Sequence, residues 1–200
     1  MTRSGSTPRV RALQLYYGAL LVAVAITDPI YGHGTAGHLA ELAGLLLVAA
    51  ATLARIWTTL YIAGHKGERI VTQGPYARCR HPLYALSIIA SLGIGLATRS
   101  LVLALLTLVV VAGLHFAAAL REERHLEATL GEGYRSYAEQ VARFCPRVTK
   151  IEMPARIEVS TAIYRKAFLD AGSILALYVA IVLIALARDA GLWPALAQLY

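Results

Sequence analysis

Five long apolar runs constrain this chain more than any other feature of its sequence. Apolar residues make up 58% of the 200 residues and charged residues only 16%, which is far from the composition of a soluble domain. A helix needs about 20 apolar residues to cross a bilayer, and four or five runs reach or approach that length. The sequence therefore predicts an all-α integral membrane protein with about five transmembrane helices. The runs cover roughly residues 13–26, 39–63, 82–97, 101–120 and 167–187.

The third apolar run is short for a helix that crosses a membrane. Its 16 or so residues would form a helix of about 24 Å, which barely spans the hydrocarbon. Gly93 and Gly95 lie within it and predict that another helix approaches closely. The turn to the fourth run, Thr98-Arg99-Ser100, is so short that the two helices must be antiparallel neighbours.

Basic residues indicate how the chain is oriented. The net charge is +7, and Lys and Arg gather before the first run, between the second and third, and between the fourth and fifth. Only Arg99 and Arg188 lie in the other connections. By the positive-inside rule, the N-terminus and both long polar segments face the cytoplasm. No basic patch is interleaved with aromatic residues, so we do not expect nucleic-acid binding.

The two cysteines, Cys79 and Cys145, fall in the segments expected to be cytoplasmic, where thiols stay reduced. They do not form a Cys-x-x-Cys pair, and we expect no disulfide. Cys79 is interpreted as a small filler beside Arg80 rather than as a nucleophile.

The start of the third run combines cationic, titratable and aromatic side chains. Pro82 suits the first turn of a helix, because its missing N–H costs nothing there. Arg80 and His81 then lie at or just before the helix cap, and a helix N-terminus beside an arginine is a ready anion site. Tyr84 lies three residues after His81 and hence on the same helical face.

A glutamate pair, Glu122-Glu123, stands at the end of the fourth run. Adjacent residues differ by about 100° around a helix, so we expect at most one of the two to point into a pocket. Glu122 shares a face with His115 and Ala118 and is the one expected to do so.

Each of these residues alone has a simpler explanation. The arginines could contact lipid headgroups, His81 could only cap a helix, Tyr76 and Tyr84 could be interfacial aromatics, and the glutamates could be solvated. Their concentration where apolar helices meet water favours a binding site at the membrane surface.

The segment after the glutamates carries an apolar stripe at helical spacing. Gly131 and Gly133 interrupt it and predict two short helices with a bend. The segment could lie on the membrane or fold as a lid that caps the site. The stripe consists of Leu126, Leu130, Tyr134, Tyr137 and Val141.

Taken together, these motifs resemble the isoprenylcysteine carboxyl methyltransferase family, within a wider group that includes membrane phospholipid methyltransferases. The resemblance covers about residues 64–147, between an N-terminal helix pair (1–63) and a linker with the last helix (148–200). It implies methyl transfer from S-adenosylmethionine at the cytoplasmic membrane face onto a lipid-borne, prenylated or otherwise hydrophobic acceptor, most directly the carboxylate of an isoprenylcysteine-like substrate. It rests on the strings Glu68 to Tyr76, Arg80-His81-Pro82-Leu83-Tyr84, Glu122-Glu123 and Arg143-Phe144-Cys145-Pro146.

The resemblance also implies roles for individual residues. Arg80, Glu123 and Arg143 are expected to take part in catalysis, and no metal is expected. Glu123 or His125 would assist only if the acceptor were an amine or a thiol that must lose a proton. The implied cofactor-binding residues are Glu68, Arg69, Ile70, Val71, Tyr76, His81, Pro82, Leu83, Tyr84 and Glu122.

The chain departs from the family pattern in its acceptor half. Ala118 and Gln140 stand where eukaryotic members have arginine, Ala142 replaces a proline, and Leu86 replaces a common glycine. The fifth run is also unusual and could wall an acceptor tunnel or form a homo-oligomer contact.

Three alternatives therefore stay open. One is a phospholipid amine or thiol methyltransferase, and another is a non-catalytic membrane scaffold that keeps the fold. The third is a membrane sterol reductase, because those enzymes share a signature like Arg-His-Pro-x-Tyr but use a nicotinamide cofactor.

Overall fold

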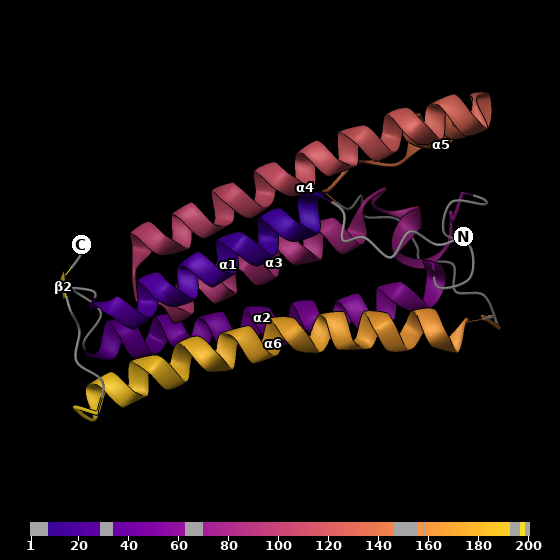
Figure 1. The fold of residues 1–200 in the computed structure, drawn as a ribbon. Helices are drawn as coiled ribbons and strands as arrows, with labels where there is room; N and C mark the ends of the chain where they lie inside the picture. Colours follow the sequence, from indigo (N-terminus) through magenta and orange to yellow (C-terminus); the bar gives the residue numbers. More distant parts are fainter. Residues whose placement is uncertain are drawn as a thin grey trace.

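The computed structural model describes residues 8–28, 34–62, 70–145, 156–157, 159–192 and 197–198. These ranges form a helical membrane protein (Figure 1). A parallel pairing of two-residue strands, β1 (Thr27–Asp28) with β2 (Ala197–Gln198), is the extent of its sheet structure in the described ranges. The helices are α1 (Pro8–Ile26), α2 (Thr35–Ile62), the 3₁₀ helix η1 (Gly74–Ala77), α3 (Pro82–Ala97), α4 (Leu101–Leu130), α5 (Glu132–Gln140) and α6 (Thr161–Asp189).

The expected apolar helices are present. Four of them, α1, α2, α4 and α6, are long and apolar enough to cross a membrane, and α3 is a shorter apolar helix of 16 residues. Numerous large apolar side chains on the long helices are exposed, which is the arrangement expected where lipid covers the outside. The core between α1, α2, α3, α4 and α6 consists of Leu20, Val24, Val48, Ile94, Ala97, Leu103, Tyr178 and Ile181.

Glycines allow α3 to lie very close to its neighbours. A Cβ atom at Gly93 would lie 2.6 Å from the carbonyl oxygen of Gly44 in α2, and one at Gly95 would lie 2.5 Å from the Cα atom of Ala104 in α4. Such distances are too short for any side chain, so the helices pack through their backbones. The close approach expected at Gly93 and Gly95 is confirmed, with a different partner helix at each.

The fourth helix is longer than predicted. The sequence places the end of the span at Leu120 and a separate short helix after it, whereas α4 runs without a break to Leu130. The predicted bend and the second short helix, α5, are confirmed. The first predicted short helix is wrong and is the end of α4, because the residues after Leu120 are good helix formers and no glycine or proline interrupts them before Gly131. At Gly131 φ is +54°, and the chain bends there into α5. The glutamate pair thus lies on the same rigid helix as the fourth span.

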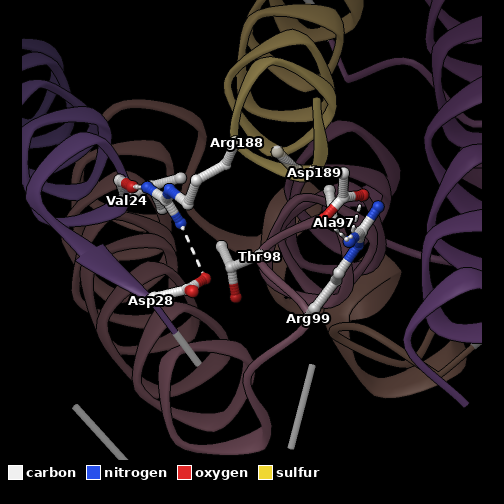
Figure 2. A pocket seen from close by; sticks show the side chains of 8 residues that line it. Val24, Asp28, Ala97, Thr98, Arg99, Arg188 and Asp189 are labelled. Atoms are coloured by element: carbon white, nitrogen blue, oxygen red, sulfur yellow. Dashed lines mark hydrogen bonds and ion pairs between the residues drawn. The ribbon is translucent and has the colours of Figure 1, made fainter. Parts of the chain in front are cut away.

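The end of the bundle opposite the start of α3 is tied together by ion pairs (Figure 2). Arg99 in the α3–α4 turn has a side chain only 3% exposed, and its Nε donates to Glu41 at 2.7 Å while Nη1 donates to Asp189 at 2.8 Å. Arg188 of α6 pairs with Asp28 at 3.4 Å and donates to the carbonyl oxygen of Val24. Hence both arginines hold helices together, and the short turn makes α3 and α4 antiparallel neighbours as expected.

Candidate active site at the start of α3

The chain before α3 is fixed by contacts that its sequence makes possible. Gly74 has φ +58°, and a Cβ atom there would lie 2.3 Å from the ring of Tyr61, so only glycine fits. The backbone N–H of Arg80 donates to the carbonyl of Ala142 at 2.8 Å, and that of His81 donates to Arg143 at 3.1 Å. These bonds hold the start of α3 against the segment that follows α5.

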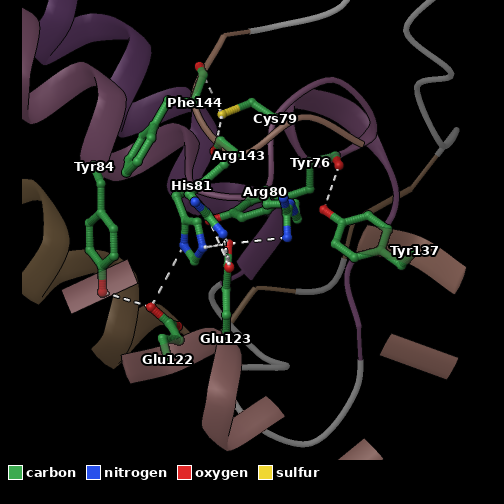
Figure 3. Close-up of polar contacts among 10 residues, drawn as sticks. All are labelled: Tyr76, Cys79, Arg80, His81, Tyr84, Glu122, Glu123, Tyr137, Arg143 and Phe144. Atoms are coloured by element: carbon green, nitrogen blue, oxygen red, sulfur yellow. Dashed lines mark hydrogen bonds and ion pairs between the residues drawn. The ribbon is translucent and has the colours of Figure 1, made fainter. Parts of the chain in front are cut away.

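Glu123 is the centre of the polar cluster at this point (Figure 3). It is only 8% exposed. Arg143 donates to both of its oxygens, from Nε at 2.9 Å and from Nη2 at 2.8 Å, and Arg80 Nη1 lies 3.2 Å from Oε1. His81 Nε2 lies 3.0 Å from the same oxygen. A buried carboxylate is stable only with such partners, so this structure brings together all three residues expected to be catalytic.

Glu122 lies beside this cluster and is more open. Its Oε2 accepts a hydrogen bond from the Tyr84 hydroxyl at 2.7 Å and lies 3.9 Å from His81 Nδ1, and its side chain is 35% exposed. The rings of His81 and Tyr84 stack at 5.4 Å, as their spacing predicts. The expectation that Glu122 is the inward residue of the pair is wrong, because Glu123 is the buried one. Both still face His81, Glu123 at one ring nitrogen and Glu122 at the other (Figure 3).

Burial sets the protonation of His81. Removal from water lowers the pKa of its imidazole below the usual value, although the hydrogen bond to Glu123 and the charge of Glu122 act in the opposite direction. At neutral pH the ring is therefore uncharged. Its Nε2–H then donates to Glu123, and Nδ1 keeps a lone pair toward Glu122.

Helix α5 forms a lid over the residues that precede α3. The Tyr137 hydroxyl donates to the carbonyl oxygen of Tyr76 at 2.7 Å, and Tyr134 and Val141 are buried. Burial raises the pKa of both Tyr76 and Tyr137 above the usual value, so each hydroxyl stays protonated. The apolar stripe predicted here is therefore an inward face that packs on the site rather than a surface-lying helix.

The remaining sequence-predicted residues are placed as follows. Ile70 and Val71 are half-buried on the segment before η1, with Ile70 beneath Gly133 of the lid. Pro82 is buried at the first position of α3, and Leu83 follows it half-buried. Glu68 and Arg69 lie outside the described residues.

The N-terminus of α3 is less open to anions than the sequence suggests. The backbone N–H groups of Tyr84 and Ala85 both donate to the carbonyl of His81, at 3.1 and 3.0 Å. Pro82 has no N–H, and those of Arg80 and His81 are engaged with the segment after α5. Side chains must therefore provide most of any anion binding at this point.

Cys79 has a structural role, as expected. Its buried thiol lies 3.3 Å from the carbonyl oxygens of both Arg143 and Phe144. Burial raises the pKa of the thiol to about 11, so it is protonated and unreactive at neutral pH. Cys145, in contrast, is exposed.

Two arginines near the site were missed by the sequence reasoning. The guanidinium carbon of Arg9 in α1 lies 4.7 Å from the centre of the Tyr84 ring. Arg55 in α2 donates to the carbonyl oxygen of Leu83 at 2.8 Å and to the hydroxyl of Ser87. The signal was available for Arg55, because a charged residue inside an apolar run commonly marks a functional site. For Arg9 no local pattern distinguishes it from other basic residues of the N-terminal segment.

Comparison with known proteins identifies a matching family model and two relatives. The phospholipid methyltransferase family model matches residues 35–133, from the start of α2 into α5. The nickel-cobalt-cadmium resistance protein NccN of Alcaligenes xylosoxydans xylosoxydans is 32% identical over 151 residues, which are 76% of this chain and 70% of that protein. The cobalt-zinc-cadmium resistance protein CzcN of Cupriavidus metallidurans is 31% identical over 185 residues, 90% of this chain and 85% of that protein. No solved structure matches the chain.

Because both relatives are named as metal-resistance proteins, side chains that could bind a metal ion are relevant here. Within the ranges that the structure describes, no group of three or more His, Cys, Asp or Glu side chains is placed to hold a metal ion.

Proposed function

This chain carries the phospholipid methyltransferase domain and belongs to one family with the two metal-resistance proteins, and from that premise we propose that it is an S-adenosylmethionine-dependent membrane methyltransferase. Its acceptor is lipid-borne or hydrophobic. The reaction we favour is carboxyl O-methylation of an isoprenylcysteine-like substrate. The single observation that carries the proposal is the convergence of His81, Tyr84 and Glu122 where α3 and α4 leave the apolar bundle.

The residues present fit the charges of this cofactor. Its ammonium and sulfonium groups suit Glu122, because only one oxygen of that carboxylate is engaged among the described residues. Its carboxylate suits Arg80, whose Nε is buried and has no acceptor in the described part of the chain. An uncharged His81 adds no repulsion toward the sulfonium.

The cofactor supplies an electrophilic methyl group, which an acceptor oxygen takes by in-line displacement while the carbon–sulfur bond breaks. The chain contributes placement, which is the largest part of what such a reaction needs. Glu123 is only 8% exposed, and the rings of His81 and Tyr84 stack beside it, so the access of water to this carboxylate is limited.

The bonds that Glu123 makes to other side chains favour a carboxylate acceptor over an amine or a thiol. A general base must be free to take a proton, whereas Glu123 is bonded to two arginines and a histidine. His125 is exposed on α4. A carboxylate acceptor needs no base at all, so it matches a site in which Glu123 is already engaged.

We place the site on the cytoplasmic side of the membrane. Arg9 contacts Tyr84 from the first turn of α1, so the start of α1 and the site lie at the same end of the bundle. The excess of Lys and Arg in the segments at this end then orients both toward the cytoplasm.

The proposed cofactor site is tested by calorimetry with S-adenosylmethionine on purified protein in detergent. Glu122→Ala and His81→Ala should each weaken binding by about tenfold or more, since each removes one charged or hydrogen-bonding partner of the cofactor cluster. Glu127→Ala, an exposed position on the same helix, is the control and should bind as the wild type does. Unchanged affinity in both site variants would overturn the assignment, provided that all variants insert into membranes.

The acceptor is tested separately. Membranes that contain the protein are incubated with methyl-labelled S-adenosylmethionine, and the labelled product is identified as a base-labile ester, a methylated amine or a thioether. An ester supports the favoured reaction, and an amine or thioether supports the phospholipid or thiol alternative. Cofactor binding without any labelled product points to a scaffold. Nicotinamide-dependent reduction of lipids without an effect of S-adenosylmethionine points to a reductase.

The names of the two relatives suggest a physiological setting, and we propose that the methylation contributes to tolerance of divalent metals. A metal-sensitive bacterium expressing the wild-type chain should grow at higher nickel, cobalt, cadmium or zinc concentrations than one expressing Glu122→Ala. Equal growth of the two strains would contradict a role of the methylation in metal tolerance.

A further inference from the structure

Two guanidinium groups from different helices lie at the first turns of α3, one at the Tyr84 ring and the other at the Leu83 carbonyl and the Ser87 hydroxyl. Arg9 of α1 lies over the Tyr84 ring at 4.7 Å. Arg55 of α2 is anchored on the preceding residue, since its Nη1 donates to the Leu83 carbonyl at 2.8 Å. The two positive charges are close enough to act on each other and on His115, whose ring meets Tyr84 edge-on at 5.3 Å.

Within the part of the chain that the structure describes, neither charge has a bound counter-ion. Among the described residues, no carboxylate oxygen lies within 4.0 Å of either guanidinium group. Asp170 of α6 attracts Arg55 only from a longer distance. The Nε atom of Arg55 is buried without a hydrogen-bond partner in the same part of the chain. Two like charges held together at the border of an apolar bundle are costly unless an anion joins them.

We propose that Arg9 and Arg55 bind the anionic head, a carboxylate or a phosphate, of the lipid that accepts the methyl group. Guanidinium groups recognise both anions through paired N–H donors. An anion held there is one side chain away from the cofactor cluster, because the Tyr84 hydroxyl donates to Glu122. The description of the lipid as an acceptor rests on the proposed methyltransferase function, whereas the anion site itself does not.

This site would account for the altered acceptor half of the sequence. Ala118 and Gln140 occupy positions where the resembled family carries arginine. Arg9 and Arg55 come from α1 and α2, so the cations that hold the acceptor would be supplied from the other side of α3. General contact with bulk headgroups explains Arg55 poorly, because its Nη1 atom fixes the side chain within the bundle, on the Leu83 carbonyl and the Ser87 hydroxyl.

The test uses pairs of lipids that differ in charge alone. Binding of radiolabelled oleate and of oleyl alcohol to the purified full chain in detergent is compared, and phosphatidic acid is compared with diacylglycerol. The wild type should bind at least one acid more tightly than its neutral partner. Arg9→Gln and Arg55→Gln should each weaken binding of that acid by about tenfold, the loss expected for one charge-assisted pair, and leave the neutral lipid within about twofold. Arg165→Gln, an exposed arginine on α6, is the matched control and should keep the wild-type preference.

The outcomes separate the sources of the anion. If the arginines are needed for a preference for oleate alone, the site binds a carboxylate. If they are needed for a preference for phosphatidic acid alone, it binds a phosphate. If they are needed for both preferences, the site accepts either anion. If Arg9→Gln keeps the wild-type preference, or if the wild type has none, the proposal is overturned. Arg55→Lys, which keeps a charge, should retain part of the preference and guards against misfolding of Arg55→Gln.

Titration of the same preparations with S-adenosylmethionine keeps the two proposals distinguishable. Cofactor binding that survives in Arg9→Gln while the acid preference disappears supports both. A wild type that binds acids through Arg9 but does not bind the cofactor would contradict the methyltransferase proposal and leave the anion site standing.

Discussion

His81 joins two carboxylates that lie on one helix. Nε2 meets Glu123 at 3.0 Å and Nδ1 faces Glu122 at 3.9 Å. The two glutamates differ in surroundings, since Glu123 is buried among arginines and Glu122 is partly open. This difference gives them separate tasks: Glu123 fixes the arginines and the histidine in place, and Glu122 is available for a ligand.

The protonation of His81 predicts how stability depends on pH. Burial lowers the pKa of His81 in the folded protein from the usual 6.5, so below that pH the unfolded chain binds more protons at this residue than the folded one does. The stabilisation is complete above pH 6.5 and is lost as the pH falls through the interval below it. We expect the melting temperature of the wild type in detergent to fall more steeply below about pH 6.5 than that of His81→Gln.

Gln is a suitable comparison because its side-chain amide can still donate to Glu123 but does not titrate in this range. Both proteins are followed by circular dichroism from pH 8 to pH 5, an interval chosen around the usual histidine pKa of about 6.5. Parallel curves over the whole interval would show that His81 does not carry the acid dependence.

At the level of elements, the close packing of α3 against its neighbours depends on two glycines, which have no side chain. Gly93 meets the backbone of α2 and Gly95 meets that of α4. The 16 residues of α3 therefore pack closely between longer helices. This packing fixes the position of the first turn of α3 relative to Glu122 and Glu123 of α4.

A methyl group at Gly93 should disrupt this packing. A Cβ atom would lie 2.6 Å from the Gly44 carbonyl oxygen, so Gly93→Ala must force the helices apart, at a cost of about 1–3 kcal/mol. Gly113→Ala on α4 is the control, because a Cβ atom there meets nothing within 4 Å. Unfolding in a series of sodium dodecyl sulfate concentrations measures both variants, and an equal response of the two would refute the backbone-contact argument.

On the scale of the whole molecule, the bundle is closed differently at its two ends. One end carries the Glu123 cluster (Figure 3), and the other carries the ion pairs of Arg99 with Asp189 (Figure 2) and with Glu41. Their separation is the length of α3, about 24 Å at 1.5 Å per residue. The ion pairs of Arg99 only hold helices together. The Glu123 cluster also holds helices together, and the partly exposed carboxylate of Glu122 lies beside it.

Removal of Arg99 should therefore reduce stability without changing the site. Arg99→Gln removes the guanidinium group that pairs with Glu41 and Asp189, and loss of one member of a buried ion pair costs about 3 kcal/mol. The melting temperature should fall clearly, while the affinity for S-adenosylmethionine of the folded fraction stays within about twofold of the wild type, as expected for sites more than a helix length apart. Arg135→Gln is the control, because its ion pair with Glu127 is exposed and exposed pairs contribute little. A large loss of affinity in Arg99→Gln would show that the two ends are coupled.

Much of this architecture could be predicted from local patterns. The apolar runs, Pro82 at the first position of α3, the short turn at Arg99 and the glycines of α3 each reflect a constraint within a few residues of chain. Spacing also placed His81 and Tyr84 on one face. The resemblance joined the Arg80–Tyr84 string with Glu122 and Glu123, which the structure brings within contact distance of each other.

Local patterns did not predict the length of α4, the burial of Glu123 rather than Glu122, or the positions of Arg9 and Arg55 beside the site. Each depends on which helices become neighbours, and helix neighbours are selected by packing between segments far apart in the chain. The sequence alone therefore determined that the chain is a bundle of membrane helices with a polar site at the start of α3, because burial of apolar residues and helix capping are local properties. Only the tertiary structure decided which charges meet at that site, because an ion pair needs two side chains at the same place. These side chains come from α1, α2, α4 and the segments before α3 and after α5.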